Sequence, residues 1–468
     1  MSDSVPHGGP TLERGALTRV NVLALALSGI SPTTSVFLLY GTALGQSGTG
    51  VIWSFLIAGV VAVCMAACFA ELGSMHPGSG GVYTIIRRVL GPVAGGVANV
   101  VCLISGLVIP ALILVAASTF LNSLVPELPV NLTALCMLLV VLGLSLGRIA
   151  PASWVATALL VLELTVVVVF AAFCFFHPAA TIGNPILHPL VASGNQIVTV
   201  ATSAVFLAVG PALFAYNGFD TPLYFDEESR GTSKNSAQAV LVAVGLGVGI
   251  ELLAVVAATL AVPDLRAVSG SPVPLVAIAE HVMGSTGAKV VTVGVIVAMF
   301  AAALAVMLVF SRIVYASARD RMWPSPVNKL FGRLSRQQVP VYSLALMGLG
   351  NAVLCAFTSL TSLAAFGGLL IMVLYVLIAI SALVSNIRDR DHVRPLKMFL
   401  WPLPPLVALV GVVLALRSQA HKDLIITACV VAVSTVGYTA IRKNLPSREA
   451  TVIARPSPSL EPVDSVVV

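Results

Sequence analysis

Charged residues are scarce in this sequence of 468 residues. Asp, Glu, Lys and Arg make up 9% of the chain, whereas a water-soluble protein carries roughly 25%, and 58% of the residues are hydrophobic. The few charges lie between long apolar segments, which excludes an ordinary soluble domain. Because a helix needs about 20 apolar residues to cross a hydrocarbon core about 30 Å thick, the apolar segments are predicted to be membrane-spanning helices.

Paired cysteines and catalytic motifs are missing as well. The seven cysteines all lie inside apolar segments and none forms a CxxC pair, so we expect neither a disulfide framework nor a metal site. The sequence contains no HExxH motif, and the glycines between residues 78 and 81 lack the Lys-Ser/Thr of a phosphate-binding loop. We therefore expect no enzyme activity and no cofactor.

The apolar segments define the domain organisation. A cytoplasmic tail of residues 1–17 is expected first, followed by a ten-span core over 18–390, two further spans within 391–443, and a polar, disordered tail over 444–468. The predicted fold class is an all-α membrane protein with twelve transmembrane helices. The spans are predicted near residues 20–45, 50–73, 92–123, 131–148, 152–176, 199–227, 237–262, 288–318, 340–358, 361–386, 398–416 and 422–441.

The basic residues predict the orientation of these spans. With the N-terminus in the cytoplasm, 21 of the 25 Lys and Arg residues fall on the cytoplasmic side and four on the outer side. Such asymmetry predicts that both termini are cytoplasmic, and it favours an even number of spans. The same distribution explains the pI near 9.0 without nucleic-acid binding, because the basic residues lie in short loops.

Two spans are predicted to be broken in the middle. Residues 28–35 of the first span read SGISPTTS, and residues 215–222 of the sixth read AYNGFDTP. Proline removes a backbone donor, and the freed polar groups are tolerated inside a membrane only where they line a cavity. Helix ends at mid-membrane offer N–H groups to an anion and carbonyls to a cation, which suits a zwitterionic amino acid.

The positions of the two breaks suggest a repeat. Spans 1 and 6 begin successive groups of five, so a five-plus-five inverted repeat would make them partners at the membrane midplane. No residue-level repeat supports this, and the inference rests on position and on the matching Gly/Pro breaks. The alternative is an ordinary proline kink in each span.

Four segments resemble a known family. Residues 70–83 (AELGSMHPGSGGVY) are similar to an "AEL…PxSGGxY" signature, and residues 218–220 (GFD), followed by Glu227 and Glu228, to a "GFD/E…EE" segment. Residues 311–324 (SRIVYASARDRMWP) resemble "SRxxYAxARDGxxP", with Arg321 in place of Gly. Residues 31–37 (SPTTSVF) stand where a "GSGIF"-like stretch is usual. The chain thus resembles the amino acid–polyamine–organocation (APC) permeases.

The resemblance covers residues 18–390 and carries several implications. It implies the leucine-transporter-type 5+5 inverted repeat, alternating access, and coupling to protons, to sodium or to exchange. The expected partners are an amino acid or amine substrate, the lipid bilayer of the cell membrane and a coupling proton or sodium ion, with the oligomeric state left open. Because the first break departs from the family pattern, substrate preference is expected to depend on residues 31–34.

The two breaks supply the candidate binding site. The substrate carboxylate is expected to meet N–H and hydroxyl groups of the first break, and the ammonium group to meet carbonyls of both breaks near Asp220. Tyr216 and Phe219 are candidates for covering the site, with Phe214 a weaker one. The predicted substrate-binding residues are Gly29, Ile30, Ser31, Pro32, Thr33, Thr34, Ser35, Tyr216, Asn217, Gly218, Phe219 and Asp220.

Three acids inside predicted spans are candidates for proton coupling. They are Asp220, Glu163 in span 5 and Glu251 in span 7. A charge in a span is costly unless it is paired or hydrated, and burial favours the protonated form of a carboxyl. The resemblance adds that some proton-coupled relatives carry a Lys near the register of Glu163, where a sodium ion would otherwise sit. The alternatives are a helix cap for Asp220 and, for Glu163, a structural partner to a polar group in span 1 or 8.

Further charges lie at the predicted cytoplasmic ends, where they form either a network that gates the inner mouth or simple interfacial anchors. They are Glu71, Arg87, Arg88, Glu227, Glu228, Arg312, Arg319 and Asp320. The sequence therefore predicts a secondary active transporter for amino acids. The alternatives are an amine or polyamine permease and a non-transporting membrane sensor.

Overall fold

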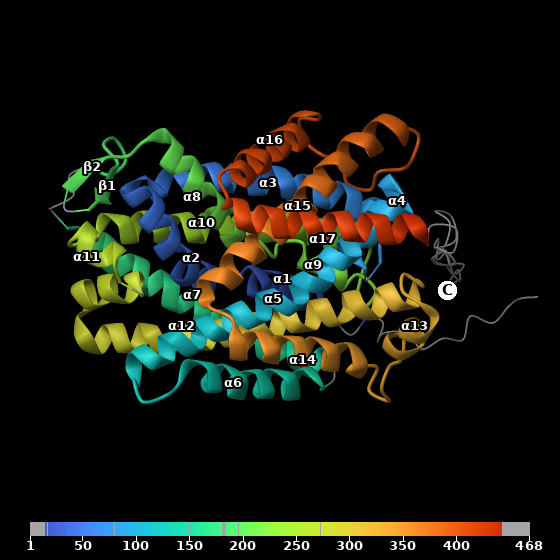
Figure 1. The fold of residues 1–468 in the computed structure, drawn as a ribbon, viewed down its shortest axis with the longest axis horizontal. Helices are drawn as coiled ribbons and strands as arrows, with labels where there is room; N and C mark the ends of the chain where they lie inside the picture. Colours follow the sequence, from blue (N-terminus) through green and yellow to red (C-terminus); the bar gives the residue numbers. More distant parts are fainter. Residues whose placement is uncertain are drawn as a thin grey trace, which may run out of the picture.

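The computed structural model describes residues 15, 17–78, 80–147, 149–179, 184–194, 196–271 and 273–441, with the side chains of 149–156 and 193 excepted. Apart from residues 15 and 17, the predicted tails (1–17 and 444–468) lie outside the described residues. The described chain is mostly helical, which confirms the all-α class. Figure 1 shows its helices running largely along one direction, as a bundle.

Helices occupy every range in which a span is predicted. The helices at those ranges are α1 (Arg19–Ile30) with α2 (Pro32–Ser47), α3 (Val51–Met75), α5 (Pro92–Leu124), α6 (Val130–Ser145), α7 (Ile149–Phe176), α8 (Thr202–Ala215) with α9 (Thr221–Tyr224), α10 (Ser233–Leu260), α12 (Pro274–Arg319), α14 (Val341–Phe357), α15 (Leu360–Arg388), α16 (Leu403–Arg417) and α17 (His421–Ala440).

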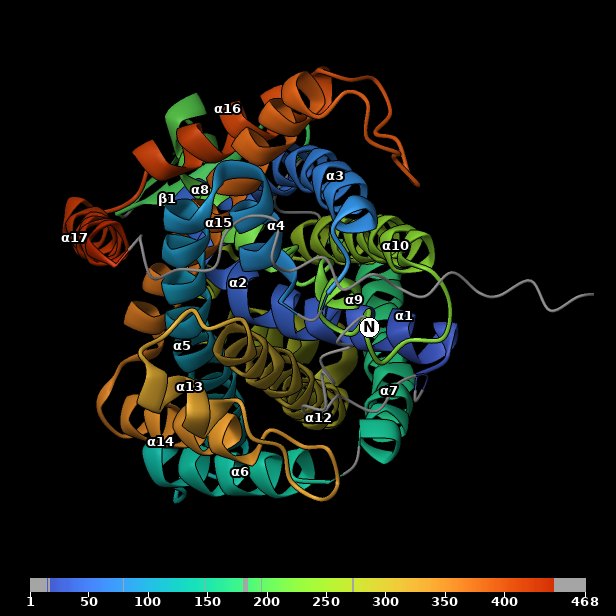
Figure 2. The same cartoon turned by 90° about the vertical axis from the view of Figure 1, so that its right-hand side faces the viewer.

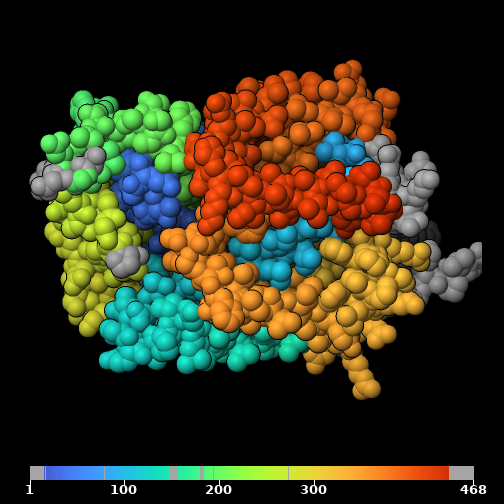
Figure 3. Space-filling view, in the orientation of Figure 1, coloured from blue at the N-terminus to red at the C-terminus, as the bar shows by residue number. Residues whose placement is uncertain are grey.

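The surface of this bundle suits hydrocarbon. Leu139 on α6, Leu349 on α14 and Val433 on α17 are each about 70% exposed, and many other large apolar side chains share this exposure. Figure 3 shows the face of the molecule to which these three helices belong. In the described residues, seven helical stretches are long and apolar enough to cross a membrane, one of them covering both α1–α2 and α3, and four shorter apolar helices accompany them. The chain is therefore a multi-pass membrane protein, and the count of twelve spans stays a prediction.

The two predicted breaks lie inside the bundle. The helix of span 1 is interrupted at Ser31, and that of span 6 between Ala215 and Thr221. Figure 2 shows α2 in the middle of the bundle, with α1 leading from it toward α7 and α10, α6 and α14 along the bottom and α16 along the top. Around the breaks, α2 packs against α8, and α1 packs against α7 and α10.

The structure adds elements that hydrophobic patterning missed. They are η1 (Gly48–Gly50), α4 (Gly81–Leu90), α11 (Leu265–Ser269), α13 (Ser325–Phe331) and the hairpin of β1 (Leu190–Ser193) with β2 (Gln196–Thr199). The hairpin and α13 lie at opposite ends of the bundle (Figure 1), which we call the hairpin end and the α13 end. The element α12 begins at Pro274, before the predicted start near residue 288, and its first segment is separated from the rest by non-helical backbone at Gly284 (φ 72°, ψ 174°).

The start of the described chain is tied to the segment that follows span 6. The N–H of Leu17 donates to the carbonyl of Glu228 across 3.0 Å, and the N–H of Arg230 donates to the carbonyl of Leu17 across 2.8 Å. The side chain of Leu17 is fully buried. The first half of span 1 is thus attached, at the α13 end, to the loop between α9 and α10.

Candidate functional site

The break in span 1 has a specific local cause. Ser31 adopts a left-handed conformation (φ 46°, ψ 76°), which is uncommon for a residue other than glycine. Pro32 follows it as the first residue of α2, where its missing N–H and fixed φ are compatible with a helix start. The N–H of Ser31 still closes the last turn of α1 on Leu27, so the chain bends between two regular helices.

The break in span 6 is longer. After α8 the chain runs through the turn of residues 216–220, in which Gly218 takes a φ of 111°. Pro222 then lies in the first turn of α9. A residue with a side chain is strained at such a φ, so the glycine permits this turn.

The two breaks approach each other closely because both use glycine. A Cβ atom on Gly218 would lie 2.5 Å from the carbonyl oxygen of Gly29, and one on Gly29 would lie 2.6 Å from the hydroxyl oxygen of Thr221. The hydroxyl of Ser35 reaches both breaks, at 2.7 Å from the carbonyl of Ile30 and 2.8 Å from that of Ala215. Backbone from span 1 therefore lies directly against backbone from span 6.

A cavity lies where the breaks meet. Its polar lining comes mainly from the breaks, and an apolar wall comes from α2, α5, α12 and α15. The polar and sulfur-bearing lining residues are Ser31, Thr34, Ser35, Cys102, Asn217, Asp220, Thr221, Tyr224 and Tyr375. The large apolar ones are Ile30, Leu38, Leu39, Phe69, Val82, Ile109, Leu112, Ile113, Phe214, Val306, Val309, Phe310, Ile371 and Leu374.

Asp220 is the one carboxylate among the described residues that line this cavity. Its Oδ2 accepts a hydrogen bond of 2.7 Å from the hydroxyl of Tyr224. On the adjoining wall, the hydroxyl of Tyr375 donates to Oδ1 of Asn217 across 3.1 Å. A carboxyl group beside hydroxyl groups and an apolar wall is suited to holding an ammonium group.

The predicted site residues separate into two groups. Eight of them line the cavity, namely Gly29, Ile30, Ser31, Thr34, Ser35, Asn217, Gly218 and Asp220, whereas Pro32, Thr33, Tyr216 and Phe219 do not. Phe219 is fully buried against Phe69, with ring centroids 5.7 Å apart, and the hydroxyl of Tyr216 donates to the carbonyl of Phe55. Of the three aromatic candidates only Phe214, the weakest from sequence, lines the cavity.

Glu163 lies behind the break of span 1 instead of in the cavity lining. Its Oε1 accepts hydrogen bonds from the hydroxyl of Ser31 (2.7 Å) and from the N–H of Thr33 (3.2 Å). The Thr33 hydroxyl also donates to the backbone carbonyl of Glu163 across 2.9 Å. The acid of span 5 therefore partners polar groups of span 1, and Ser31 connects it to the cavity.

Glu251 approaches the same break from α10. Its side chain is fully buried, and neither carboxyl oxygen has a hydrogen-bond partner in the described part of the chain. One turn earlier, a Cβ atom on Gly247 would lie 3.1 Å from the side chain of Ile30, the residue before Ser31. The helices that carry Glu163 and Glu251, α7 and α10, pack against each other, and both pack against α1, so the two acids approach the break of span 1 from neighbouring helices.

Most of the end-of-span charges named from sequence form ion pairs at the α13 end. Arg312 makes two hydrogen bonds with Glu228 (2.6 and 3.1 Å), and Arg319 makes two with Glu227 (both 2.8 Å). These pairs join the end of α12 to the loop after α9. Bidentate Arg–carboxylate pairs are geometrically specific, so they favour this junction over simple anchoring.

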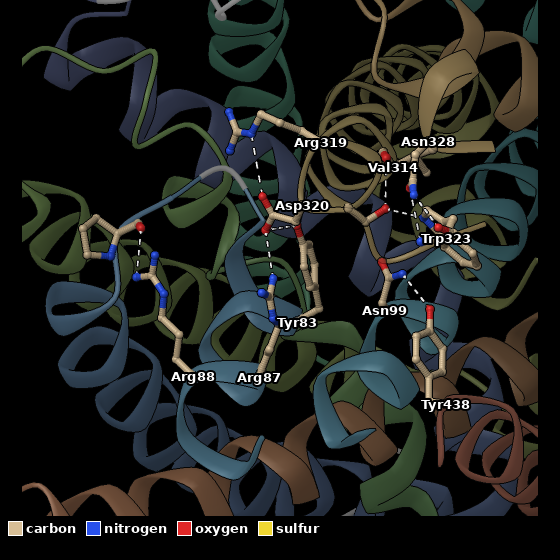
Figure 4. Close-up of polar contacts among 12 residues, drawn as sticks. Tyr83, Arg87, Arg88, Asn99, Val314, Arg319, Asp320, Trp323, Asn328 and Tyr438 are labelled. Carbon is tan, nitrogen blue, oxygen red and sulfur yellow. Dashed lines mark hydrogen bonds and ion pairs between the residues drawn. The ribbon is translucent and has the colours of Figure 1, made fainter. Parts of the chain in front are cut away.

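A second cluster joins α4 to the end of α12 (Figure 4). Arg87 lies 3.5 Å from Asp320, whose carboxylate also accepts a 3.1 Å hydrogen bond from the hydroxyl of Tyr83. Burial raises the pKa of the Asp320 carboxyl, and the guanidinium groups of Arg319 and Arg87 oppose that shift. The arginines thus help to keep this buried acid charged.

Sequence reasoning missed several partners in these clusters. Arg394 lies 2.8 Å from Glu71, and Asn386 donates a hydrogen bond to the same carboxylate. Both residues come later in the chain than the segments that carry the family signatures. Asn99 and Tyr438, which link α5 to α17, were missed as well (Figure 4). A polar residue near a helix end signals such a role only weakly, because the same position suits an interfacial anchor.

Comparison with known proteins places this geometry in context. A family model described as amino acid permease matches residues 17–438. The chain is 24% identical to the branched-chain amino acid permease BcaP of Lactococcus lactis over 84% of this chain and 87% of that protein. It is 26% identical to the vacuolar cationic amino acid transporter 2 of Arabidopsis thaliana, over 81% and 60%. It is 20% identical to the low-affinity putrescine importer PlaP of Escherichia coli, over 74% and 76%.

Proposed function

The chain belongs to the amino acid permease family within the APC superfamily, and from this premise we propose that it moves amino acids across the cell membrane by alternating access. The proposal includes twelve spans, the first ten forming a five-plus-five inverted repeat, with both termini cytoplasmic. The single observation that carries it is a cavity between two broken helices, with polar backbone and one carboxylate on one side and hydrocarbon on the other.

The basic residues support the proposed orientation. Arg87, Arg312 and Arg319 gather at the α13 end, whereas Arg266 of α11 lies at the hairpin end. An excess of Lys and Arg marks the cytoplasmic side of a membrane protein. The α13 end is therefore the cytoplasmic end in this proposal, and the ion pairs there close the path from the cavity to the cytoplasm.

The substrate's charged groups fit the two polar sides of the cavity. Its carboxylate lies at the N-terminal end of α2, near Ser31, Thr34 and Ser35, where the helix dipole favours an anion. Its ammonium group lies near Asp220 and the carbonyls of the breaks. Its side chain faces the apolar wall, which favours an aliphatic side chain over a charged one.

Coupling to protons is the favoured energy source. Glu163 is fully buried, and its hydrogen bonds go to span 1 at the point where the substrate carboxylate is expected. A carboxyl group there can take up a proton in one step of the cycle and release it in another. Asp220 and Glu251 are further candidates for carrying the proton. The uptake experiment below distinguishes proton coupling from sodium coupling and from exchange.

Uptake into proteoliposomes tests the proposal. Purified protein should accumulate labelled leucine when an inward pH gradient is imposed, and a sodium gradient alone should drive no uptake. A thermal-shift screen of neutral, cationic and anionic amino acids should show the largest stabilisation with aliphatic ones, since a ligand that binds the native state raises its melting temperature. Binding without uptake under any gradient would favour a sensor instead.

An amine permease is the second candidate, and a specific observation favours it. Three carboxyl groups lie at or behind the cavity, those of Asp220, Glu163 and Glu251. Among the described residues, no Lys or Arg side chain forms an ion pair with any of them. A substrate with only positive charge would suit them, and one relative is named as a putrescine importer. If 3-methylbutylamine or putrescine displaces bound leucine and leucine itself is not transported, this candidate replaces the first.

A further inference from the structure

Two carboxyl groups lie behind the break of span 1, outside the cavity, and we propose that they form a site for one shared proton. The groups are those of Glu163 on α7 and Glu251 on α10. We infer that this proton must be bound before a substrate carboxylate can occupy the N-terminal end of α2. The inference rests on the proposed transport of amino acids, and its test separates the two.

The first step is the position of Glu163. Its Oε1 already accepts the N–H of Thr33 and the hydroxyl of Ser31, which are donors at the start of α2. An ionised Glu163 therefore supplies its own negative charge to the helix end that attracts anions. The hydroxyl of Ser31 also contacts that of Thr34 (2.6 Å), and both residues line the cavity. A substrate carboxylate at this helix end would face a like charge a few side-chain atoms away.

The second step is the unsatisfied chemistry of the pair. Glu251 is fully buried with no hydrogen-bond partner for either carboxyl oxygen, and Oε2 of Glu163 also lacks one, within the described part of the chain. An ionised carboxylate in such surroundings is strongly disfavoured. Two negative charges on neighbouring, packed helices cannot both be accommodated without partners, so one proton for the pair is the expected occupancy.

The third step concerns the charges around the pair. Two titratable tyrosines lie on the elements packed against α7 and α10. Tyr216, just after α8, lies near Glu251, and Tyr40 of α2 lies near Cys174 of α7 and Thr259 of α10, closer to the ends of those two helices. No recorded interaction in the described residues brings a cation to either acid. The other charged and histidine side chains of the neighbouring helices lie at or toward helix ends, namely Arg19, Glu71, Lys234, Glu280, His281, Lys289, Arg312 and Arg319.

Together these steps couple the proton to the substrate. A proton on Oε2 of Glu163 neutralises the charge at the start of α2 and leaves Oε1 free to keep its two hydrogen bonds. The substrate carboxylate can then bind at the same helix end. Because one proton accompanies one carboxylate, the affinity for an amino acid should rise about tenfold for each pH unit of acidification, until the site is fully protonated.

The pair also predicts the opposite sign for a substrate without a carboxylate. An amine gains from an ionised pair and should bind more tightly as the pH rises. The sign of the pH dependence of affinity therefore indicates whether the substrate carries a carboxylate. The number of protons bound or released with each substrate, which should be one, indicates that a single proton site is involved.

Calorimetric binding of leucine to the purified full-length protein tests the inference. Titrations in buffers with different ionisation enthalpies count the protons taken up with each leucine. The wild type should take up close to one proton at pH values where its affinity varies. Glu163→Gln should take up none and bind leucine with less than about twofold change across the pH range, while Glu163→Asp, which keeps a carboxyl group, should retain the dependence.

Glu251→Gln tests whether the two acids act as a pair. It removes the second negative charge, so the pH at which leucine affinity is half maximal should move at least about one unit toward acid. The matched control is Glu280→Gln, an exposed carboxyl on α12, which should leave both the proton count and the midpoint unchanged. Gel filtration and the melting temperature identify any variant that does not fold.

The outcomes distinguish the two proposals. Leucine binding that takes up no proton in the wild type overturns the inference and leaves amino acid transport standing. An unchanged midpoint in a folded Glu251→Gln protein overturns the pairing. If leucine does not bind but 3-methylbutylamine binds more tightly at alkaline pH with release of one proton, the proton site stands and the proposed substrate class fails.

Discussion

Arg312 and Glu228 face each other through two hydrogen bonds of 2.6 and 3.1 Å, and both side chains are almost completely buried. Arg312 also donates to the carbonyl of Leu308, and its guanidinium lies 5.0 Å from the ring centroid of Phe225. Removing one partner of a buried ion pair leaves an uncompensated charge, which costs more than the pair itself contributes.

Arg312→Ala or Glu228→Ala should therefore lower the free energy of unfolding by about 3–5 kcal/mol. Thermal unfolding in detergent measures this as a fall in melting temperature. The double variant Arg312→Met with Glu228→Met should recover most of the loss, because no charge remains unpaired. Lys289→Ala, an exposed residue on the same helix, is the control and should change little. Equal melting temperatures for single and double variants would contradict this account.

The contact between the breaks predicts a strong effect of one methyl group. Gly218→Ala combines a disfavoured φ with a Cβ atom 2.5 Å from the Gly29 carbonyl, so span 6 must move away from span 1. We expect uptake to fall at least about tenfold, since displacement of binding groups by about 1 Å can cost on the order of 100-fold. Gly245→Ala, on α10 with open space around the added atom, should transport normally. Normal uptake by Gly218→Ala would show that this close approach is dispensable.

Asp220 should contribute to binding through the substrate's ammonium group. A hydrogen bond to a charged group is worth about 1.5–3 kcal/mol, so Asp220→Asn should weaken leucine binding by roughly 10- to 100-fold. Tyr224→Phe removes the hydroxyl that donates to this carboxylate and should have a smaller effect. Equilibrium binding with leucine and with its deaminated analogue, 4-methylpentanoate, locates the loss. If both ligands weaken equally, Asp220 acts by shaping the cavity instead of holding the ammonium group.

The apolar wall predicts selectivity by side-chain size. Each buried methylene is worth about 0.8 kcal/mol, so affinity should rise about fourfold per added carbon from alanine through 2-aminobutyrate to valine and leucine. Ile113→Ser places a hydroxyl group in the wall and should reduce this slope. Competition against labelled leucine measures the series. A flat series would mean that the substrate's side chain does not contact these residues.

The ion pairs at the α13 end predict when the cavity becomes accessible from that side. Cys102 lines the cavity and is 1% exposed, so it can report opening to a membrane-impermeant thiol reagent. In a background where Cys64, Cys136 and Cys429 are replaced by Ala, Arg87→Gln or Glu227→Gln should raise the labelling rate of Cys102 several-fold, because closing contacts are lost. Arg266→Gln at the other end serves as the control. Unchanged labelling would assign the ion pairs a purely structural role.

The positions of the long helices could be predicted well, because each of them coincides with a long apolar segment of the sequence. Apolar length located the helices to within a few residues in most cases, and Gly and Pro in an apolar run located both interruptions. The hairpin at residues 190–199 was missed because each of its strands has only four residues, far fewer than the apolar length by which the spans were located. The first segment of α12 was missed because it is a short helix, set off from the long one by non-helical backbone at Gly284.

The contacts of the candidate site could be predicted only in part. If both breaks are central, the residues beside them must lie near each other. This reasoning predicted the positions of Ser35 and Asp220 at the cavity. The direction in which Glu163 points could not be read from α7, because a span that is apolar on every side has no periodicity to orient it. That Phe219 and Tyr216 do not line the cavity could not be predicted either, because an irregular turn has no fixed period to indicate which side chain faces a cavity.

The hydrogen bonds of Leu17 have a mechanical consequence. They attach the start of α1 to the loop that carries Glu227 and Glu228, and those acids are bound in turn to the end of α12. The first half of span 1, the end of span 6 and the end of span 8 are therefore expected to tilt as a single rigid lever. Ser31, with a proline directly after it and no regular helix across it, is the pivot of that lever.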